Sequence, residues 1–220
     1  MDQICELAAI VLLAMASVYD LRERTIPDKL WVIGSALGLT MKLLNHDQTI
    51  QFISKAWPFL LILLIMLAME WLLSLSGQAD VLAYLTLTTL LSGNCMFPDA
   101  FLAYLLSKIL IVLIIPFQFL VNIVKISRNH KLVEGFDEPL WRKVLALMVL
   151  SPYDERLAKF ASPAEANVNG KRKFVLRAAL SISQNDSLRE GSWIAPAYPA
   201  MPFILAATVI TITIPQLLLH

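Results

Sequence analysis

The chain has 220 residues, of which 58% are hydrophobic and only 16% charged, and its mean hydropathy is +0.67. This composition excludes an ordinary soluble domain and predicts a membrane protein. The formal net charge is +1 and no basic surface is interleaved with aromatic residues, so we expect no nucleic-acid partner. Cys5 and Cys95 lie far apart and the three histidines are scattered. We therefore expect neither a metal site nor a cofactor.

Six apolar stretches follow one another along the chain, each of roughly the 17–25 residues that cross a bilayer. A polar region separates the fifth stretch from the sixth, and with Lys125 at its edge it holds 12 of the 18 Lys and Arg residues. We predict an all-α membrane protein with about six transmembrane helices and a small cytosolic insertion before the last helix. The apolar stretches are 3–19, 27–44, 56–76, 81–97, 100–125 and 193–218, and the predicted domains are 1–125, 126–192 and 193–220.

The polar insertion contains one clear periodic segment. Residues 139–150 are predicted to form a short amphipathic helix, and two interpretations of it stay open. It either lies on the membrane surface or packs in the core of the insertion itself. The run 162–170 is rich in Ala, Asn and Gly and is predicted to be a loop. The apolar side of the predicted helix carries Leu140, Trp141, Val144, Leu145 and Met148.

The placement of the cations predicts the orientation in the membrane, because loops that stay in the cytoplasm accumulate Lys and Arg. An outside N-terminus places Arg22, Arg24, Lys29 and the insertion on the inner side, which gathers 15 of the 18 cations there. We therefore predict a multi-pass protein of the cell membrane with both termini outside.

Two carboxylates fall at the same predicted membrane face. Asp20 ends the first apolar stretch, and Asp80 follows the third. Two carboxylates held close together share one proton, so the ionised one can activate a water while the protonated one polarises an amide carbonyl. This pattern is typical of an aspartic protease. The structural alternative makes Asp20 a partner of nearby arginines and Asp80 the N-cap of the following helix.

The segments around both aspartates are similar to those of a known family. The run 20–28, Asp-Leu-Arg-Glu-Arg-Thr-Ile-Pro-Asp, resembles the first active-site segment of type IV prepilin peptidases. The run 77–80, Gly-Gln-Ala-Asp, resembles their Gly-x-Gly-Asp element, with Ala79 and Ser74 where glycines often stand and Leu82 where many members carry a lysine. The order of the spans is most similar to the archaeal preflagellin peptidase branch.

This resemblance implies an endopeptidase that removes short basic leader peptides from preflagellins or type IV prepilins at the cytoplasmic membrane face. It implies Asp20 and Asp80 as the catalytic pair, substrate proteins and the lipid bilayer as partners, and no methyltransferase activity, since a cysteine-rich metal element is missing. The sequence does not indicate an oligomeric state. The residues implied to support the active-site loop are Arg22, Arg24, Pro27, Gly77 and Ala79.

Other ionisable residues leave alternatives open. Glu70 and Lys108 lie within apolar stretches, where each is either a structural or a functional residue. In a functional role, Glu70 would support the catalytic pair without touching the substrate. Glu23 and Asp28 are alternative catalytic acids near Asp20. A small ion-coupled transporter would use the same intramembrane charges along its pathway, and a catalytically silent scaffold of a pilus or archaellum system would need none of them.

Overall fold

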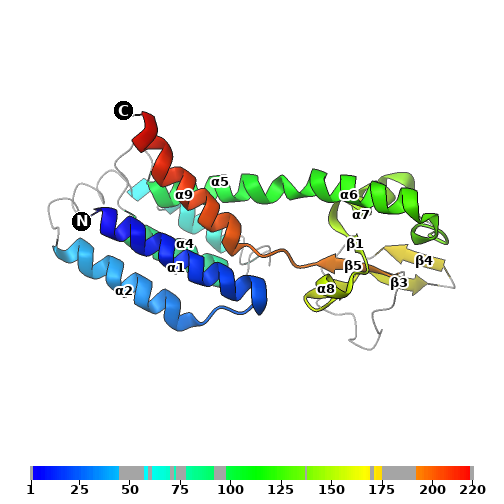
Figure 1. The fold of residues 1–220 in the computed structure, drawn as a ribbon, viewed down its shortest axis with the longest axis horizontal. Helices are drawn as coiled ribbons and strands as arrows, with labels where there is room; N and C mark the ends of the chain where they lie inside the picture. Colours follow the sequence, from blue (N-terminus) through cyan, green and yellow to red (C-terminus); the bar gives the residue numbers. More distant parts are fainter. Residues whose placement is uncertain are drawn as a thin grey trace. The chain divides into compact units, whose positions relative to one another are not determined.

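The computed structural model describes residues 2–44, 57–58, 61–69, 72, 78–91, 98–136, 138–168, 171–174 and 192–218. The chain divides into two compact units (Figure 1): unit 1 is Met1–Ile111 with Pro199–His220, and unit 2 is Val112–Tyr198. The helices of unit 1 are α1 (Asp2–Arg22), α2 (Asp28–Leu44), α4 (Gln78–Leu90), α5 (Asp99–Val112) and α9 (Met201–Leu218), together with the helical residues 61–69.

Unit 2 combines helices with short strands. Its helical elements are α6 (Ile114–Arg128), η1 (His130–Leu132), α7 (Leu140–Val149) and α8 (Glu155–Ala158). Its strands are β1 (Ser151–Pro152), β2 (Ala161–Pro163), β3 (Glu165–Val168), β4 (Lys171–Phe174) and β5 (Trp193–Pro196). The structure is mostly helical, which confirms the all-α prediction in part, and the helix predicted at 139–150 is confirmed as α7.

The strands of unit 2 correct two predictions. The fold is not all-α, and the run 162–170 is not simply a loop, because it contains most of β2 and β3. One antiparallel sheet has the order β1-β5-β2, and β3 pairs with β4 in a second sheet. These strands are two to four residues long, too short for an alternating pattern to stand out in a sequence. The apolar stretch predicted at 193–218 likewise divides into β5 and α9.

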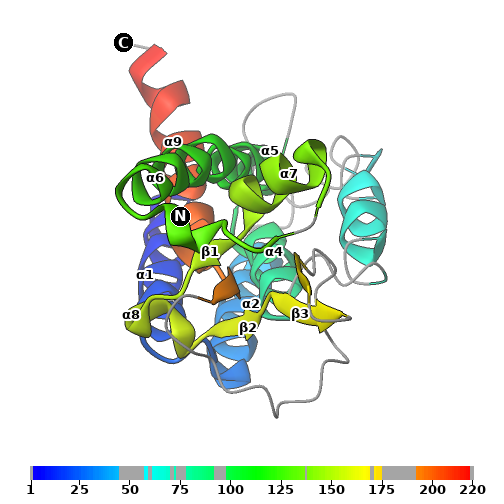
Figure 2. The same cartoon turned by 90° about the vertical axis from the view of Figure 1, so that its right-hand side faces the viewer.

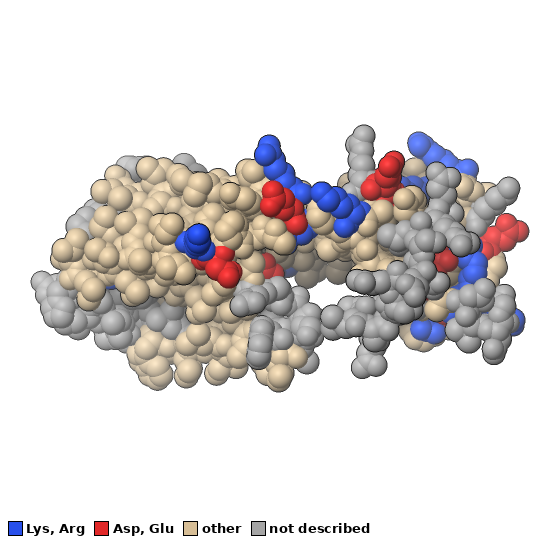
Figure 3. Space-filling view, turned by 90° about the horizontal axis from the view of Figure 1, so that it is seen from below, with Lys and Arg blue, Asp and Glu red and all other residues tan. Residues whose placement is uncertain are grey.

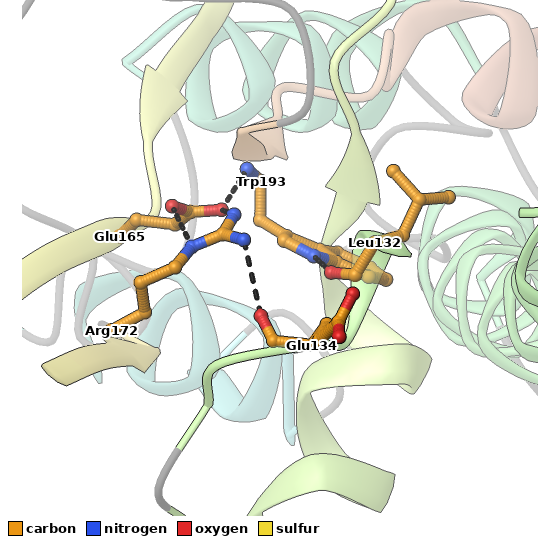
Figure 4. A network of polar contacts seen from close by, with 5 residues as sticks. All are labelled: Leu132, Glu134, Glu165, Arg172 and Trp193. Atoms are coloured by element: carbon orange, nitrogen blue, oxygen red, sulfur yellow. Dashed lines mark hydrogen bonds and ion pairs between the residues drawn. The ribbon is translucent and has the colours of Figure 1, made fainter. Parts of the chain in front are cut away.

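A polar network connects the strands of unit 2 (Figure 4). The Glu165 carboxylate accepts the Trp193 backbone N–H at 2.6 Å and the Arg172 guanidinium at 2.8 and 3.3 Å. Arg172 also donates to the Glu134 carbonyl, and its guanidinium lies 4.4 Å from the centre of the Phe136 ring. The basic run in β4 thus contributes a structural cation.

Removal of the Glu165 carboxylate is expected to destabilise unit 2. Glu165→Ala leaves Arg172 and the Trp193 N–H without their shared acceptor, which costs about 2 kcal/mol, since a hydrogen bond to a charged group contributes roughly 1.5–3 kcal/mol. Glu134→Ala is the matched control, because the network uses only the backbone carbonyl of that exposed residue. Thermal unfolding followed by near-UV circular dichroism compares the two, and equal melting temperatures would contradict the assignment.

The helices of unit 1 bury small, aliphatic and aromatic side chains between them and also expose many large apolar ones. Leu13, Ala83 and Tyr84 are fully buried, whereas Val32 and Ile33 are 67% and 68% exposed. On the face drawn in Figure 3, these helices carry few charged side chains except near the end where α1 ends and α2 begins. An apolar outer surface of this kind is typical of helices covered by lipid.

Two described helices are long and apolar enough to cross a bilayer. They are Gln3–Arg22 and Asp99–Arg128, the second of which runs through α5 and α6 and has little of its apolar window buried. The apolar helices Ala79–Leu90 and Met201–Ile214 are shorter. Six complete spans therefore stay a prediction.

Candidate active site

Asp20 lies near the C-terminal end of α1 and is held by two partners. Its Oδ2 accepts the backbone N–H of Met201 at 3.0 Å, and its Oδ1 lies 3.6 Å from Nη1 of Arg24. The Asp20 side chain is only 13% exposed. Met201 is the first residue of α9, so a carboxylate from the start of the chain binds the N-terminus of the last described helix.

Both predicted catalytic aspartates continue the buried face of their helices. On α1, Ala9, Leu13 and Ala16 are fully buried, and Asp20 follows them at helical spacing. On α4, Asp80 precedes the buried residues Ala83, Tyr84 and Leu87 at the spacing i, i+3, i+4 and i+7. Both aspartates are partly buried, whereas Glu23 and Asp28 are exposed.

The helix contacts place these two aspartates at one end of unit 1. Helix α2 runs antiparallel to α1 after a short turn. It runs parallel to α4, because Gly34 faces Thr86 and Gly38 faces Thr89, so that the residue numbers of both helices rise in the same direction. Gly34 also faces Leu12, so Leu12, Gly34 and Thr86 share one level.

The distance of each aspartate from this level follows from the helical rise of 1.5 Å per residue. Asp20 is eight residues beyond Leu12, or roughly 12 Å along α1. Asp80 is six residues before Thr86, or roughly 9 Å along α4 in the same direction. The structure thus brings both aspartates to the same end of the same helical unit, without reference to the distribution of Lys and Arg.

Three of the described helices begin at this end of unit 1. Asp28 lies in the first turn of α2, Asp80 lies in the first turn of α4, and Asp20 binds the first residue of α9. The N-terminus of a helix carries a partial positive charge from its unpaired N–H groups. The site therefore provides backbone dipoles that favour negative charge where the carboxylates gather.

The other residues predicted to support the site are placed differently. Arg22 and Pro27 are exposed, and Ala79 packs against the core of unit 1. Arg24 is partly buried and has a φ of +57°, a left-handed backbone conformation that non-glycine residues adopt at a cost. This conformation turns the chain from α1 toward α2. Gly77 and Glu70 lie outside the described residues.

Lys108 lies against two aromatic rings of unit 1. Its Nζ is 5.8 Å from the centre of the Tyr84 ring and 5.3 Å from that of Tyr104. The hydroxyls of Tyr84 and Ser107 are hydrogen-bonded to each other at 2.5 Å, and both residues are fully buried. Leu82, where many prepilin peptidases carry a lysine, packs against the core of unit 1.

The contact between Asp20 and α9 predicts an effect of proline at position 201. Met201→Pro removes the N–H that Asp20 accepts, while proline is well tolerated at the first position of a helix. Met201→Ala keeps the N–H and removes most of the same buried side chain, so it is the matched control. We expect the free energy of unfolding of the proline variant to be about 1.5 kcal/mol lower than that of the alanine variant, because a hydrogen bond to a charged group is lost. Equal unfolding free energies in detergent would contradict this contact.

Unit 2 contains a separate open cavity of about 740 Å³. It includes none of the residues predicted to be catalytic or to support the active-site loop. Among the residues that the structure describes, no group of three or more His, Cys, Asp or Glu side chains is arranged to hold a metal ion. The cavity is lined by Lys125, Arg128, Asn129, Leu132, Pro152, Tyr153, Asp154 and Glu155.

Comparison with protein families gives one match. A model described as the type IV leader peptidase family matches residues 7–120, a segment that includes Asp20, Asp80 and all of α2, α4 and α5. Comparisons with curated proteins and with solved structures give no significant match. Most of unit 2 lies outside the matched segment.

Proposed function

Since this chain belongs to the type IV leader peptidase family, which is membrane-associated, we propose that it is an aspartic endopeptidase whose catalytic residues are Asp20 and Asp80. Leader peptidase activity in general, with prepilin-type proteins as substrates, follows from the family itself. The aspartic mechanism, the identity of the two residues and the membrane face are our proposal.

One observation supports this proposal most directly. Asp20 and Asp80 are partly buried on the inward faces of α1 and α4, at the same end of unit 1. Burial favours them over Glu23 and Asp28, whose exposed side chains face away from the helix core. A carboxylate pair needs a partly dehydrated setting to share a proton, and the inward faces provide one.

The proposed reaction is a hydrolysis without a covalent intermediate. The ionised carboxylate takes a proton from a water molecule as its oxygen attacks the carbonyl carbon of the scissile amide. The protonated carboxylate donates a hydrogen bond to the carbonyl oxygen, on which negative charge develops. Collapse of the tetrahedral intermediate breaks the C–N bond, and the leaving amine takes up a proton from the pair. Water supplies one proton and the hydroxyl group of the new acid.

The membrane arrangement is part of the proposal. We infer six transmembrane helices, of which α9 is the last, a cytosolic insertion at about 126–192 that β5 extends, and both termini outside. The aspartates then lie at the cytoplasmic face, where a basic leader precedes the apolar helix of a preflagellin or prepilin. The distribution of 15 of the 18 cations on one side supports this orientation. We expect cleavage without methylation of the product.

A cleavage assay in proteoliposomes tests the function. The purified chain is incubated with prepilin-type substrates that carry a short basic leader before an apolar helix, in the presence of a methyl donor. Mass spectrometry is expected to show one new N-terminus directly before the apolar helix and no added methyl group. If none of a set of substrates with varied leaders is cut, the result would contradict the protease function and favour a transporter or a catalytically silent scaffold. A mass increase corresponding to a methyl group would contradict the proposed specificity of reaction.

A further inference from the structure

Helix α7 presents an apolar face that the described part of unit 2 leaves uncovered. At 100° per residue, the residues of this face occupy one continuous half of the helix surface. Leu140, Trp141 and Leu145 are 79%, 61% and 42% exposed. A helix that faces water carries polar residues on its outer half, and α7 carries none there. The apolar face of α7 consists of Leu140, Trp141, Val144, Leu145, Met148 and Val149.

The opposite half of α7 supplies the packing that holds the helix in unit 2. Ala146 is fully buried, and Leu147 packs against the same cluster as Phe136 and Trp193. Leu150, directly after the helix, is buried in this cluster too. One half of α7 therefore packs in the core of unit 2, through Ala146 and Leu147. The other half, the apolar face, is not part of that core.

The C-terminal end of α7 is hydrogen-bonded to two residues in the middle of α6. The buried Asn122 side chain donates to the carbonyls of Leu147 and Leu150 at 2.8 and 2.6 Å, and Gln118 donates to the Leu150 carbonyl at 3.3 Å. These contacts satisfy the last carbonyls of α7, which have no partner within the helix.

The height of this attachment corresponds to a membrane surface. The apolar helix Asp99–Arg128 has 30 residues, or about 45 Å at 1.5 Å per residue, whereas a hydrocarbon core is about 30 Å thick. Gln118 and Asn122 follow Asp99 by 19 and 23 residues, close to the roughly 20 residues that a transmembrane helix needs. With Asp99 at one edge of the hydrocarbon, the attachment of α7 lies at the other edge.

The direction of α7 fits a position in the membrane surface. Figure 2 shows α6 nearly end-on and α7 from its side, so α7 runs across the axis of α6. If α6 crosses the bilayer, α7 is parallel to the bilayer plane. The amphipathic ring of Trp141 on the apolar face suits the same depth. Arg142 lies at the edge of this face and is paired with the buried Glu138 carboxylate at 2.9 Å.

We propose that α7 is an interfacial helix, whose apolar face is inserted into the lipid bilayer at the boundary between headgroups and acyl chains. Such helices bury their apolar face about 5–10 Å deep. The occupant of this face is lipid, because α7 is attached through Gln118 and Asn122 to a helix that is long and apolar enough to cross a bilayer and has little of its apolar window buried. The inference does not depend on the peptidase mechanism.

Site-directed spin labelling of the full chain tests this position. Cys5 and Cys95 are replaced by alanine, and a nitroxide is attached to Leu145→Cys on the apolar face. Ser162→Cys, at an exposed polar position in β2 of the same unit, is the matched control. Both proteins are reconstituted in vesicles of phosphatidylethanolamine and phosphatidylglycerol, and collision of the label with oxygen and with a water-soluble nickel chelate is measured by power saturation. Oxygen concentrates in the acyl chains, whereas the chelate stays in water.

The expected result is a severalfold higher ratio of oxygen to chelate collisions at position 145 than at position 162. Trp141→Cys, one turn earlier on the apolar face, is expected to agree with position 145. Equal ratios at 145 and 162 would overturn the proposal, since the face would then be in water. Shielding of 141 and 145 from both reagents would overturn it too, because a protein surface would then cover the face. The readout is independent of leader cleavage, so a failed peptidase assay and a failed insertion are distinguishable.

Discussion

Asp20→Asn and Asp80→Asn are each expected to lower kcat/KM for leader cleavage by about 10²–10⁴-fold, the contribution typical of a positioned general acid or base. Asparagine keeps the size of the side chain and can still accept the Met201 N–H, so helix packing should survive. It can neither take nor give up the proton that the reaction transfers. Initial cleavage rates in proteoliposomes at matched protein amounts measure the effect.

The controls for this prediction stand at the same end of unit 1. Glu23→Gln and Asp28→Asn remove exposed carboxylates beside the proposed pair and are expected to change the rate by less than about threefold, as for surface substitutions away from a site. The double variant of Asp20 and Asp80 should be no slower than the slower single variant, because residues that act as a unit are not additive. Normal cleavage by Asp80→Asn, or full loss on Asp28→Asn, would show that the pair is wrongly assigned.

Gly38→Ala is expected to destabilise unit 1 by about 3 kcal/mol, a value at the upper end of typical overpacking effects. It is also expected to reduce the rate of cleavage. A Cβ at this position would stand 2.7 Å from the backbone carbon and oxygen of Thr89. Backbone atoms of a helix cannot step aside alone, so α2 and α4 must separate. Because α4 carries Asp80, the separation moves one carboxylate relative to the other.

Gly34→Ala is the matched control, one turn earlier on the same face of α2. There the atoms nearest to a Cβ would be side-chain methyl groups of Leu12 and Thr86, at 2.2 and 2.8 Å, and side chains give way more easily than a helix backbone. We expect a cost of about 1 kcal/mol, at the lower end of overpacking effects. Unfolding in detergent and the cleavage rate are measured for both variants. A larger loss for Gly34→Ala than for Gly38→Ala would refute the account of this helix contact.

The sequence allowed the helical fold, the family and the helix at 139–150 to be predicted, because each has a periodic or local signal. It did not lead to the contact between α2 and α4, although the signal was present. Gly34 and Gly38 form a Gly-x-x-x-Gly pattern within an apolar stretch, which is typical of closely packed membrane helices. The hydroxyls of Ser35 and Thr86, 3.0 Å apart, add a polar contact to the same interface.

Other features had no local signal at all. The bond between Asp20 and Met201 joins residues 181 positions apart, and only the tertiary structure brings them together. The short strands of unit 2 are defined by their pairing partners, so β5 was predicted as the beginning of a membrane helix.

The bond between Asp20 and the first residue of α9 also sets an order of assembly. During synthesis, α1, α2, α4 and α5 are all complete before any of unit 2 exists, yet Asp20 still lacks its backbone donor. The donor arrives only after the whole of unit 2 has been made and the chain has returned to unit 1. A nascent chain that stops before α9 therefore contains both aspartates but lacks the Met201 N–H that Asp20 accepts. The surroundings of Asp20 are thus complete only once α9 has been made and packs against α1.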